Sequence, residues 1–234
     1  MASYFDHFIS VKILNLYIND LLFILLLVII ITFIFSYNSS LVPSNFQFIM
    51  EKIYTHWGGV IKENLGEGYE YFKLPLFSLF IFLLGINFLS FFLFTFPPTT
   101  HLSITFGLSF SLWLGIVILG VIKFRLNYFS SFMPLGAPLS LSVLLVGIEI
   151  ASYISRPIAL GMRLAANLTA GHILLAILGD FGVKMLYVTF SLSNLFPILI
   201  MIFMVILESG VLVIQAYVFT LLLVIYLKDS LILH

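Results

Sequence analysis

The chain has 234 residues, of which 62% are hydrophobic and only 9% are charged, and its mean hydropathy is +1.21. This composition excludes a water-soluble domain, and the formal net charge of zero gives no basis for nucleic-acid binding. Without cysteine, the chain can form no disulfide and no thiolate metal site. Its apolar runs are continuous rather than alternating, which favours an all-α membrane protein over a β-barrel.

Residues 1–40 predict a first transmembrane helix. Residues 21–35 are almost purely aliphatic and aromatic, and the extension to 17–37 reaches the ~20 residues that a spanning helix needs. Residues 1–12 lack the Arg-rich, acid-poor pattern of a transit peptide. The chain is therefore either inserted from inside its organelle or already in mature form, and the sequence does not distinguish the two.

Residues 41–73 predict an interfacial amphipathic helix. Between residues 44 and 65, apolar side chains recur at helical spacing, whereas charged side chains fall largely on the other side. A helix of this kind lies on the membrane rather than crossing it. We expect Gly58 and Gly59 to form a weak point, and the alternative for this segment is a loose surface loop.

Residues 74–122 predict a transmembrane hairpin. Its first helix covers residues 74–96 and is closed by Pro97 and Pro98, and its second covers residues 102–122. His101, in the connection, is interpreted as a loop residue. The next segment, residues 127–138, contains two prolines and a glycine, so we expect ordered coil there.

Residues 139–227 form the longest apolar segment, and they are interrupted only by residues 179–182. Each of its two runs, if fully helical, would be about 60 Å long, twice the ~30 Å hydrocarbon core of a bilayer. Each run is therefore either two spans, broken near Pro157 or Pro197, or one long and steeply tilted helix. The residues alone leave both interpretations open.

Ionisable side chains lie inside this apolar segment. Glu149, Arg156 and Arg163 are spaced seven residues apart, and seven helical steps drift only about 20° around the axis. Asn167 lies one turn beyond Arg163 on the same face. A charged group at bilayer depth costs at least ~2.5 kcal/mol, so such residues are functional candidates by default. Arg156 alone has an equally plain structural interpretation: it pairs with Glu149 or reaches the head groups.

Further along, His172 and Glu208 are the other titratable candidates, and Gln215 follows Glu208 by seven residues. Imidazole has an ordinary pKa of about 6.5, which suits the exchange of protons near neutrality. No Gly-rich phosphate-binding loop and no set of metal ligands is present, so we expect no cofactor, no metal site and no catalytic residue.

Two stretches, Glu149 to Pro157 and Arg163 to His172, resemble the signature of subunit a of F-type ATP synthase, in its mitochondrial form. The resemblance extends to residues 95–102 and 132–138, and to Glu208 and Gln215. The pairing of His172 with Glu208 is typical of the mitochondrial form, because bacterial relatives usually have an acid at the first position and often a histidine at the second.

The resemblance implies a proton-channel stator that is not catalytic by itself. Arg163 would be the charge barrier facing the c-ring, with His172, Glu208 and Asn167 in the half-channel from the intermembrane space. Glu149 would lie in the matrix half-channel, and Gln215 would help to position Arg163. The implied fold has about five transmembrane helices, of which the last two are long and form a hairpin. Its partners would be the c-ring, the peripheral stalk, other membrane-sector subunits and lipids, with protons as the transported ion.

Basic residues predict the orientation in the mitochondrial inner membrane. If five helices cross and the N-terminus lies in the intermembrane space, the C-terminus lies in the matrix. Lys52, Lys62, Lys73, Lys123, Arg125 and Lys228 then face the matrix, and only Lys12 and Lys184 face the other side. This distribution obeys the positive-inside bias, but seven crossings would give the same count.

Other classes of membrane protein were weighed against this interpretation. A haem-binding subunit of a respiratory complex needs paired histidines inside its spans, and His172 is the only clearly intramembrane histidine. A proton-coupled secondary transporter could also use a buried Arg and Glu. It is disfavoured because Arg163 has no obvious carboxylate partner on its own helix. A His–Glu pathway favours H⁺ over Na⁺, which calls for several converging oxygen ligands.

Overall fold

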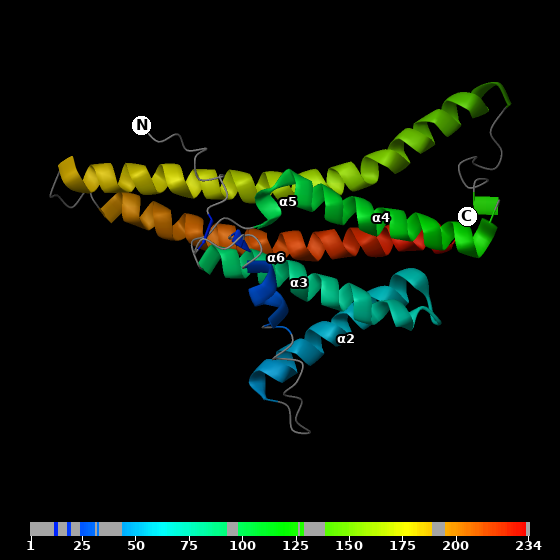
Figure 1. The fold of residues 1–234 in the computed structure, drawn as a ribbon, viewed down its shortest axis with the longest axis horizontal. Helices are drawn as coiled ribbons and strands as arrows, with labels where there is room; N and C mark the ends of the chain where they lie inside the picture. Colours follow the sequence, from blue (N-terminus) through cyan, green and yellow to red (C-terminus); the bar gives the residue numbers. More distant parts are fainter. Residues whose placement is uncertain are drawn as a thin grey trace. The chain divides into compact units, whose positions relative to one another are not determined.

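A computed structural model of the chain describes residues 12–13, 18–19, 24–30, 32, 44–92, 98–125, 127–128, 139–188 and 195–232. Helix dominates the described residues (Figure 1). The exceptions in regular structure are two strands of two residues each, β1 (Lys12–Ile13) and β2 (Ile18–Asn19), which pair antiparallel. The prediction of an all-α membrane protein is confirmed.

The chain folds into two compact units. The first comprises the described residues of Met1–Asn38, Ile81–His101 and Leu164–Tyr217, and the second those of Ser39–Phe80, Leu102–Arg163 and Val218–His234. Most of the predicted first span lies outside the described residues. Residues 24–30 are helical, and their buried Ile24 and Val28 pack with Ile86 in the first unit.

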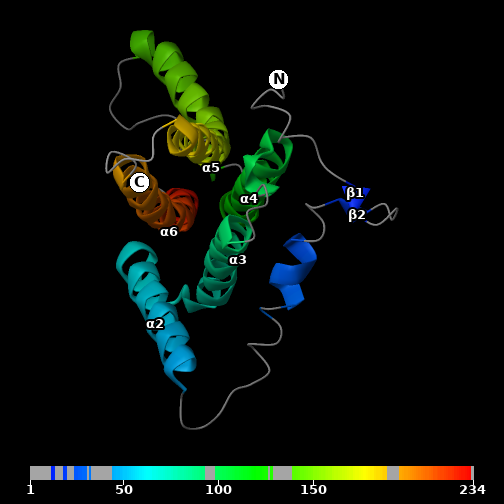
Figure 2. The same ribbon diagram turned by 90° about the vertical axis from the view of Figure 1, so that its left-hand side faces the viewer.

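Helix α2 (Asn45–Leu65) occupies the segment for which an amphipathic helix was expected (Figure 2). The Ser44 hydroxyl caps its start by accepting a hydrogen bond from the Gln47 N–H, at 3.4 Å. Trp57 is fully buried, with its ring centroid 5.5 Å from that of Phe80. The loose-loop alternative is therefore excluded, whereas the interfacial position of α2 stays a prediction.

The expected weak point in α2 is absent, because the helix runs unbroken through both glycines. Gly58 lies under the Lys73 side chain: a Cβ there would come within 2.8 Å of Lys73 Cε. The ammonium group of Lys73 in turn lies 3.8 Å from the centroid of the Tyr54 ring. The lack of a side chain at Gly58 thus permits a contact that holds α2 against the start of the next helix.

The predicted hairpin consists of α3 (Lys73–Phe92) and α4 (Leu102–Phe124), with short 3₁₀ turns η2 (Glu70–Phe72) and η3 (Pro98–Thr100) before and after α3. In the first unit, the Thr99 hydroxyl donates to the buried Asn87 carboxamide oxygen at 2.9 Å, which ties η3 back to α3. Of the loop expected at residues 127–138, the structure describes residues 127–128, which form a 3₁₀ turn.

The last two helices answer the question that the sequence left open. Helix α5 (Leu139–Val188) has 50 residues and α6 (Leu195–Leu231) has 37, so each apolar run is one long helix (Figure 1). At ~1.5 Å per residue, α5 is about 75 Å long, which requires strong tilt or extension beyond the hydrocarbon. Four helices of the described residues are long and apolar enough to cross a membrane, α5 and α6 among them.

The expected separator at residues 179–182 is wrong, because these residues lie inside α5. A glycine in a helix costs only ~1 kcal/mol, whereas opening the backbone in hydrocarbon costs several kcal/mol per unpaired group. Pro157 lies within α5 and does not end it. Pro197 lies in the first turn of α6, where its missing N–H would have had no helical partner in any case.

Candidate functional site

The polar residues singled out in the sequence all lie on α5 and α6, and the structure gives them different environments. Glu149, Arg163 and Asn167 are exposed on the surface of α5. Arg156 and His172, on the same helix, are half-buried. Glu208 and Gln215 on α6 are both buried, each with 5% of its surface exposed.

Arg163 is exposed although its neighbours Leu164 and Ala165 are buried. Its side chain therefore lies on the surface of the described part of the chain. Ala159 and Ala166, about one turn before and after it, are exposed as well. Small side chains around a guanidinium leave room for another surface to approach it closely.

A close contact between α4 and α5 in the second unit lies two residues before Arg163 and fixes the α5 backbone there. Gly161 of α5 is buried against α4, where a Cβ would lie 2.8 Å from Ser109 Oγ and 3.3 Å from the Thr105 carbonyl oxygen. Neither atom can withdraw far, because Ser109 and Thr105 are themselves 1% exposed. The backbone of α5 is thus packed tightly two residues before Arg163.

In the first unit, the Glu208 carboxyl lies against the backbone of α5. A Cβ placed on Gly171 would be 2.7 Å from Glu208 Oε1, so this carboxyl occupies the space that a side chain at Gly171 would take. His172 is the next residue along α5. The structure therefore brings Glu208 to the level of His172, which no spacing in the sequence required.

The Glu208 carboxyl is buried without a hydrogen-bond partner: within the described part of the chain, neither Oε1 nor Oε2 has one. Leaving a buried polar group unpaired costs ~1–3 kcal/mol, and more for a charged one. Such a group is retained where its chemistry is used or where water supplies the missing bonds. Glu208 is thus a candidate functional residue on the evidence of its burial alone.

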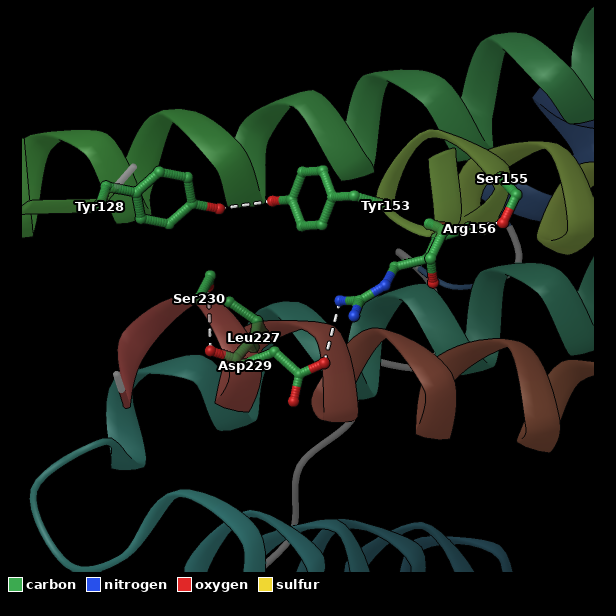
Figure 3. A network of polar contacts seen from close by, with 8 residues as sticks. Tyr128, Tyr153, Ser155, Arg156, Leu227, Asp229 and Ser230 are labelled. Carbon is green, nitrogen blue, oxygen red and sulfur yellow. Dashed lines mark hydrogen bonds and ion pairs between the residues drawn. The ribbon is translucent and has the colours of Figure 1, made fainter. Parts of the chain in front are cut away.

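Arg156 forms an ion pair that the sequence analysis did not foresee. Its Nη1 lies 2.9 Å from Oδ2 of Asp229, on α6, and Glu149 is not its partner (Figure 3). Pairing with Glu149 was one of the structural alternatives for Arg156, and it is wrong because the side chain turns toward the neighbouring helix. Asp229 was missed because, next to Lys228 and near the chain end, it has the pattern of an interfacial charge. The available signal was its spacing from Tyr226, one helical turn away.

Metal ligands do not gather in the described residues, where no group of three or more His, Asp or Glu side chains could hold an ion. The candidate residues divide between the two units: Glu149, Arg156 and Arg163 lie in the second, and Asn167, His172, Glu208 and Gln215 in the first.

Comparison with known proteins assigns the chain to a family. The family model described as ATP synthase A chain matches residues 20–228, which is most of the sequence. This chain belongs to that family. It is 46% identical to ATP synthase subunit a of Metridium senile over 233 residues, covering 100% of this chain and 99% of the relative.

Two more distant members of the ATP synthase A chain family are similar to this chain over nearly the same length. The subunit a of Zancudomyces culisetae is 37% identical over 225 residues, covering 92% of this chain and 89% of the relative. That of Chondrus crispus is 36% identical over 221 residues, covering 92% and 87%. The chain is therefore a multi-pass membrane subunit of the membrane sector of ATP synthase, and it takes part in ATP synthesis.

Proposed function

We propose that this subunit forms two offset proton half-channels that deliver protons to and from the carboxylates of a rotating c-ring. The observation that carries the proposal is the Glu208 carboxyl, buried without a hydrogen-bond partner against Gly171 beside His172. A carboxyl and an imidazole at the same level of the helices offer two groups that can accept and release protons. Proton flow through it would drive rotation, and the subunit itself would catalyse no bond-forming step.

Arg163 would separate the two half-channels. A guanidinium cannot lose its proton, so it repels a passing proton and attracts an ionised carboxylate. Its exposure on α5, flanked by small residues, supports a carboxylate supplied by another subunit. The proposed partner is the c-ring, with the peripheral stalk and other membrane-sector subunits holding this chain against it.

The remaining candidates take roles according to their positions. Asn167 and His172 would line the half-channel from the intermembrane space together with Glu208. Glu149, exposed near the other end of α5, would lie on the matrix half-channel. Gln215, buried on α6 seven residues beyond Glu208, would help to position Arg163.

The orientation follows from the same proposal. The chain would lie in the mitochondrial inner membrane, with its N-terminus in the intermembrane space and its C-terminus in the matrix. One charge crossing 100 mV releases ~2.3 kcal/mol, so several protons must pass for each ATP. A rotating ring can add up the energy of several protons before each ATP is made. The channel subunit would therefore work beside a ring rather than alone.

Proton leak and coupled synthesis in vesicles test the role of Arg163. We expect Arg163→Ala in the assembled complex to abolish coupled ATP synthesis and to let protons pass passively, because no fixed charge would separate the half-channels. Arg163→Lys should leave a smaller leak, since it keeps the positive charge but changes its geometry. Coupled synthesis that survives in Arg163→Ala would contradict the proposal.

A further inference from the structure

A second polar cluster lies in the second unit and joins α5 to the C-terminal end of α6. Its centre is the Arg156–Asp229 ion pair, at 2.9 Å, whose side chains are 21% and 41% exposed. The guanidinium Cζ also lies 5.1 Å from the centroid of the Tyr153 ring and 5.2 Å from that of Tyr226. Two aromatic faces thus flank one charge.

Each helix contributes an aromatic residue and a charged residue to this cluster. Tyr153 and Arg156 are three residues apart on α5, and Tyr226 and Asp229 are three apart on α6. Residues at this spacing are neighbours on one helical face. The two helical faces meet so that the positive Arg156 lies against the negative Asp229 (Figure 3). The contact therefore depends on opposite charges and on one alignment of α5 along α6.

A third helix is tied to the same cluster. The Tyr153 hydroxyl shares a short hydrogen bond with the hydroxyl of Tyr128. Tyr128 is 4% exposed, and its ring covers Gly120 of α4, where a Cβ would collide with the ring atoms. Trp113, also on α4, has its ring centroid 5.4 Å from that of Tyr153. The cluster therefore connects α4, α5 and α6.

The cluster lies at a point where the backbone of α5 lacks one helical hydrogen bond. Pro157 directly follows Arg156, and a proline inside a helix cannot donate the hydrogen bond to the carbonyl four residues earlier, here that of Tyr153. Helices bend at such points. The side chains at 153 and 156 are held by α6 and by Tyr128 at the turn that has lost this bond.

We propose that the Arg156–Asp229 pair, with its two tyrosines, is a latch that fixes the bend of α5 at Pro157. Arg156 and Asp229 are then positioning residues: they set the direction of the α5 segment that carries Glu149, and neither carries protons. The latch rests on the proposed function only in assigning Glu149 to the matrix half-channel. Its structural part, the fixed bend, stands on the contacts alone.

A double-mutant comparison separates a latch from a proton carrier. In the assembled complex, Arg156→Gln or Asp229→Asn alone leaves one partly buried charge without its partner. We expect coupled ATP synthesis to fall about tenfold in each single variant. It should recover to within about threefold of wild type in the Arg156→Gln/Asp229→Asn double variant, because two neutral carboxamides can hydrogen-bond to each other in place of the ion pair. The double variant has no carboxylate at 229, so its recovery excludes proton transfer through Asp229.

An exposed ion pair of the same kind is the matched control. Lys62 and Glu67 lie 2.7 Å apart, with side chains 60% and 81% exposed. Removing either should change synthesis less than about twofold, because water screens exposed ion pairs so that they contribute little. A similar loss in Lys62→Gln and in Arg156→Gln would point to a general effect of charge on assembly and would overturn the latch.

The bend itself can be followed without any proton flow. The chain has no cysteine, so spin labels can be placed at Leu144→Cys on α5 and Phe110→Cys on α4, both exposed positions. We expect the distance distribution to broaden in each single variant and to narrow again in the double. An unchanged distribution in all variants, or a double variant as inactive as Asp229→Asn, would refute the latch. Arg163→Ala in the same vesicles tests the proposed function separately.

Discussion

At the scale of single residues, the environments of the charged groups differ more than their spacing implies. Glu149, Arg156 and Arg163 share a stripe in the sequence, yet Arg156 is half-buried in an ion pair and the other two are exposed. Glu208 is buried and unpaired within the described residues. Helix α5 thus carries one charge that is held in an ion pair and two that are exposed.

Gly171 tests the position of the Glu208 carboxyl. We expect Gly171→Ala to push that carboxyl aside, because the new Cβ would lie 2.7 Å from Oε1. The side chain can rotate, so the free energy of unfolding should change by less than ~1 kcal/mol, while proton flow through the complex falls severalfold. ATP-driven proton pumping in vesicles measures the flow.

The matched control is Gly179→Ala, in the same helix, where a Cβ would meet nothing within 4 Å. It should leave pumping unchanged and stabilise the helix slightly, since alanine is the better helix former. Equal pumping in Gly171→Ala and wild type would show that the exact place of the Glu208 carboxyl does not matter.

At the scale of elements, the close approach of α4 and α5 matters most for the site. Because Gly161 has no side chain, Ser109 Oγ and the Thr105 carbonyl oxygen can contact the α5 backbone. An ordinary side chain there would push the helices apart. The length of α5 and its passage through Pro157 then carry any displacement toward both Arg163 and Glu149.

We expect Gly161→Ala to destabilise the subunit by ~1–3 kcal/mol, because overpacking against a backbone carbonyl cannot be relieved by a rotamer change. Coupled synthesis should fall as well, since Arg163 lies two residues away. Thermal unfolding of the assembled complex measures the first effect. Gly115→Ala on α4, with nothing within 4 Å, is the control and should unfold at or above the wild-type temperature.

At the scale of the whole molecule, the orientation in the membrane stays a prediction that the candidate spans make testable. Helix α3 is a candidate span, and it separates Glu67 from Ser103. Under the proposed orientation, Glu67 faces the matrix and Ser103 lies near the intermembrane space. Both residues are exposed in the structure.

Single cysteines in this cysteine-free chain test that orientation. A membrane-impermeant thiol reagent should label Glu67→Cys in inside-out vesicles and Ser103→Cys in right-side-out vesicles. Labelling of both variants from one side would contradict the crossing of α3. Labelling of each from the other side would leave α3 in place but reverse the proposed orientation.

The residue pattern alone predicted most of the architecture. Apolar length predicted the all-α membrane fold, helical periodicity predicted α2, and the prolines and polar breaks located α3 and α4 to within a few residues. The charges at 149, 163 and 208 stood out because an apolar segment has few reasons to carry them. These properties are local, and a single segment determines each of them.

Other features depended on contacts between segments distant in sequence. The structure decided that Arg156 pairs with Asp229 rather than Glu149, and that the Glu208 carboxyl lies against Gly171. It also showed that α5 runs unbroken through residues 179–182, where glycine was taken as a separator. Spacing along a chain specifies which residues share a face of one helix. Which face meets which neighbour depends on the register and crossing of two helices, and only the tertiary packing decides that.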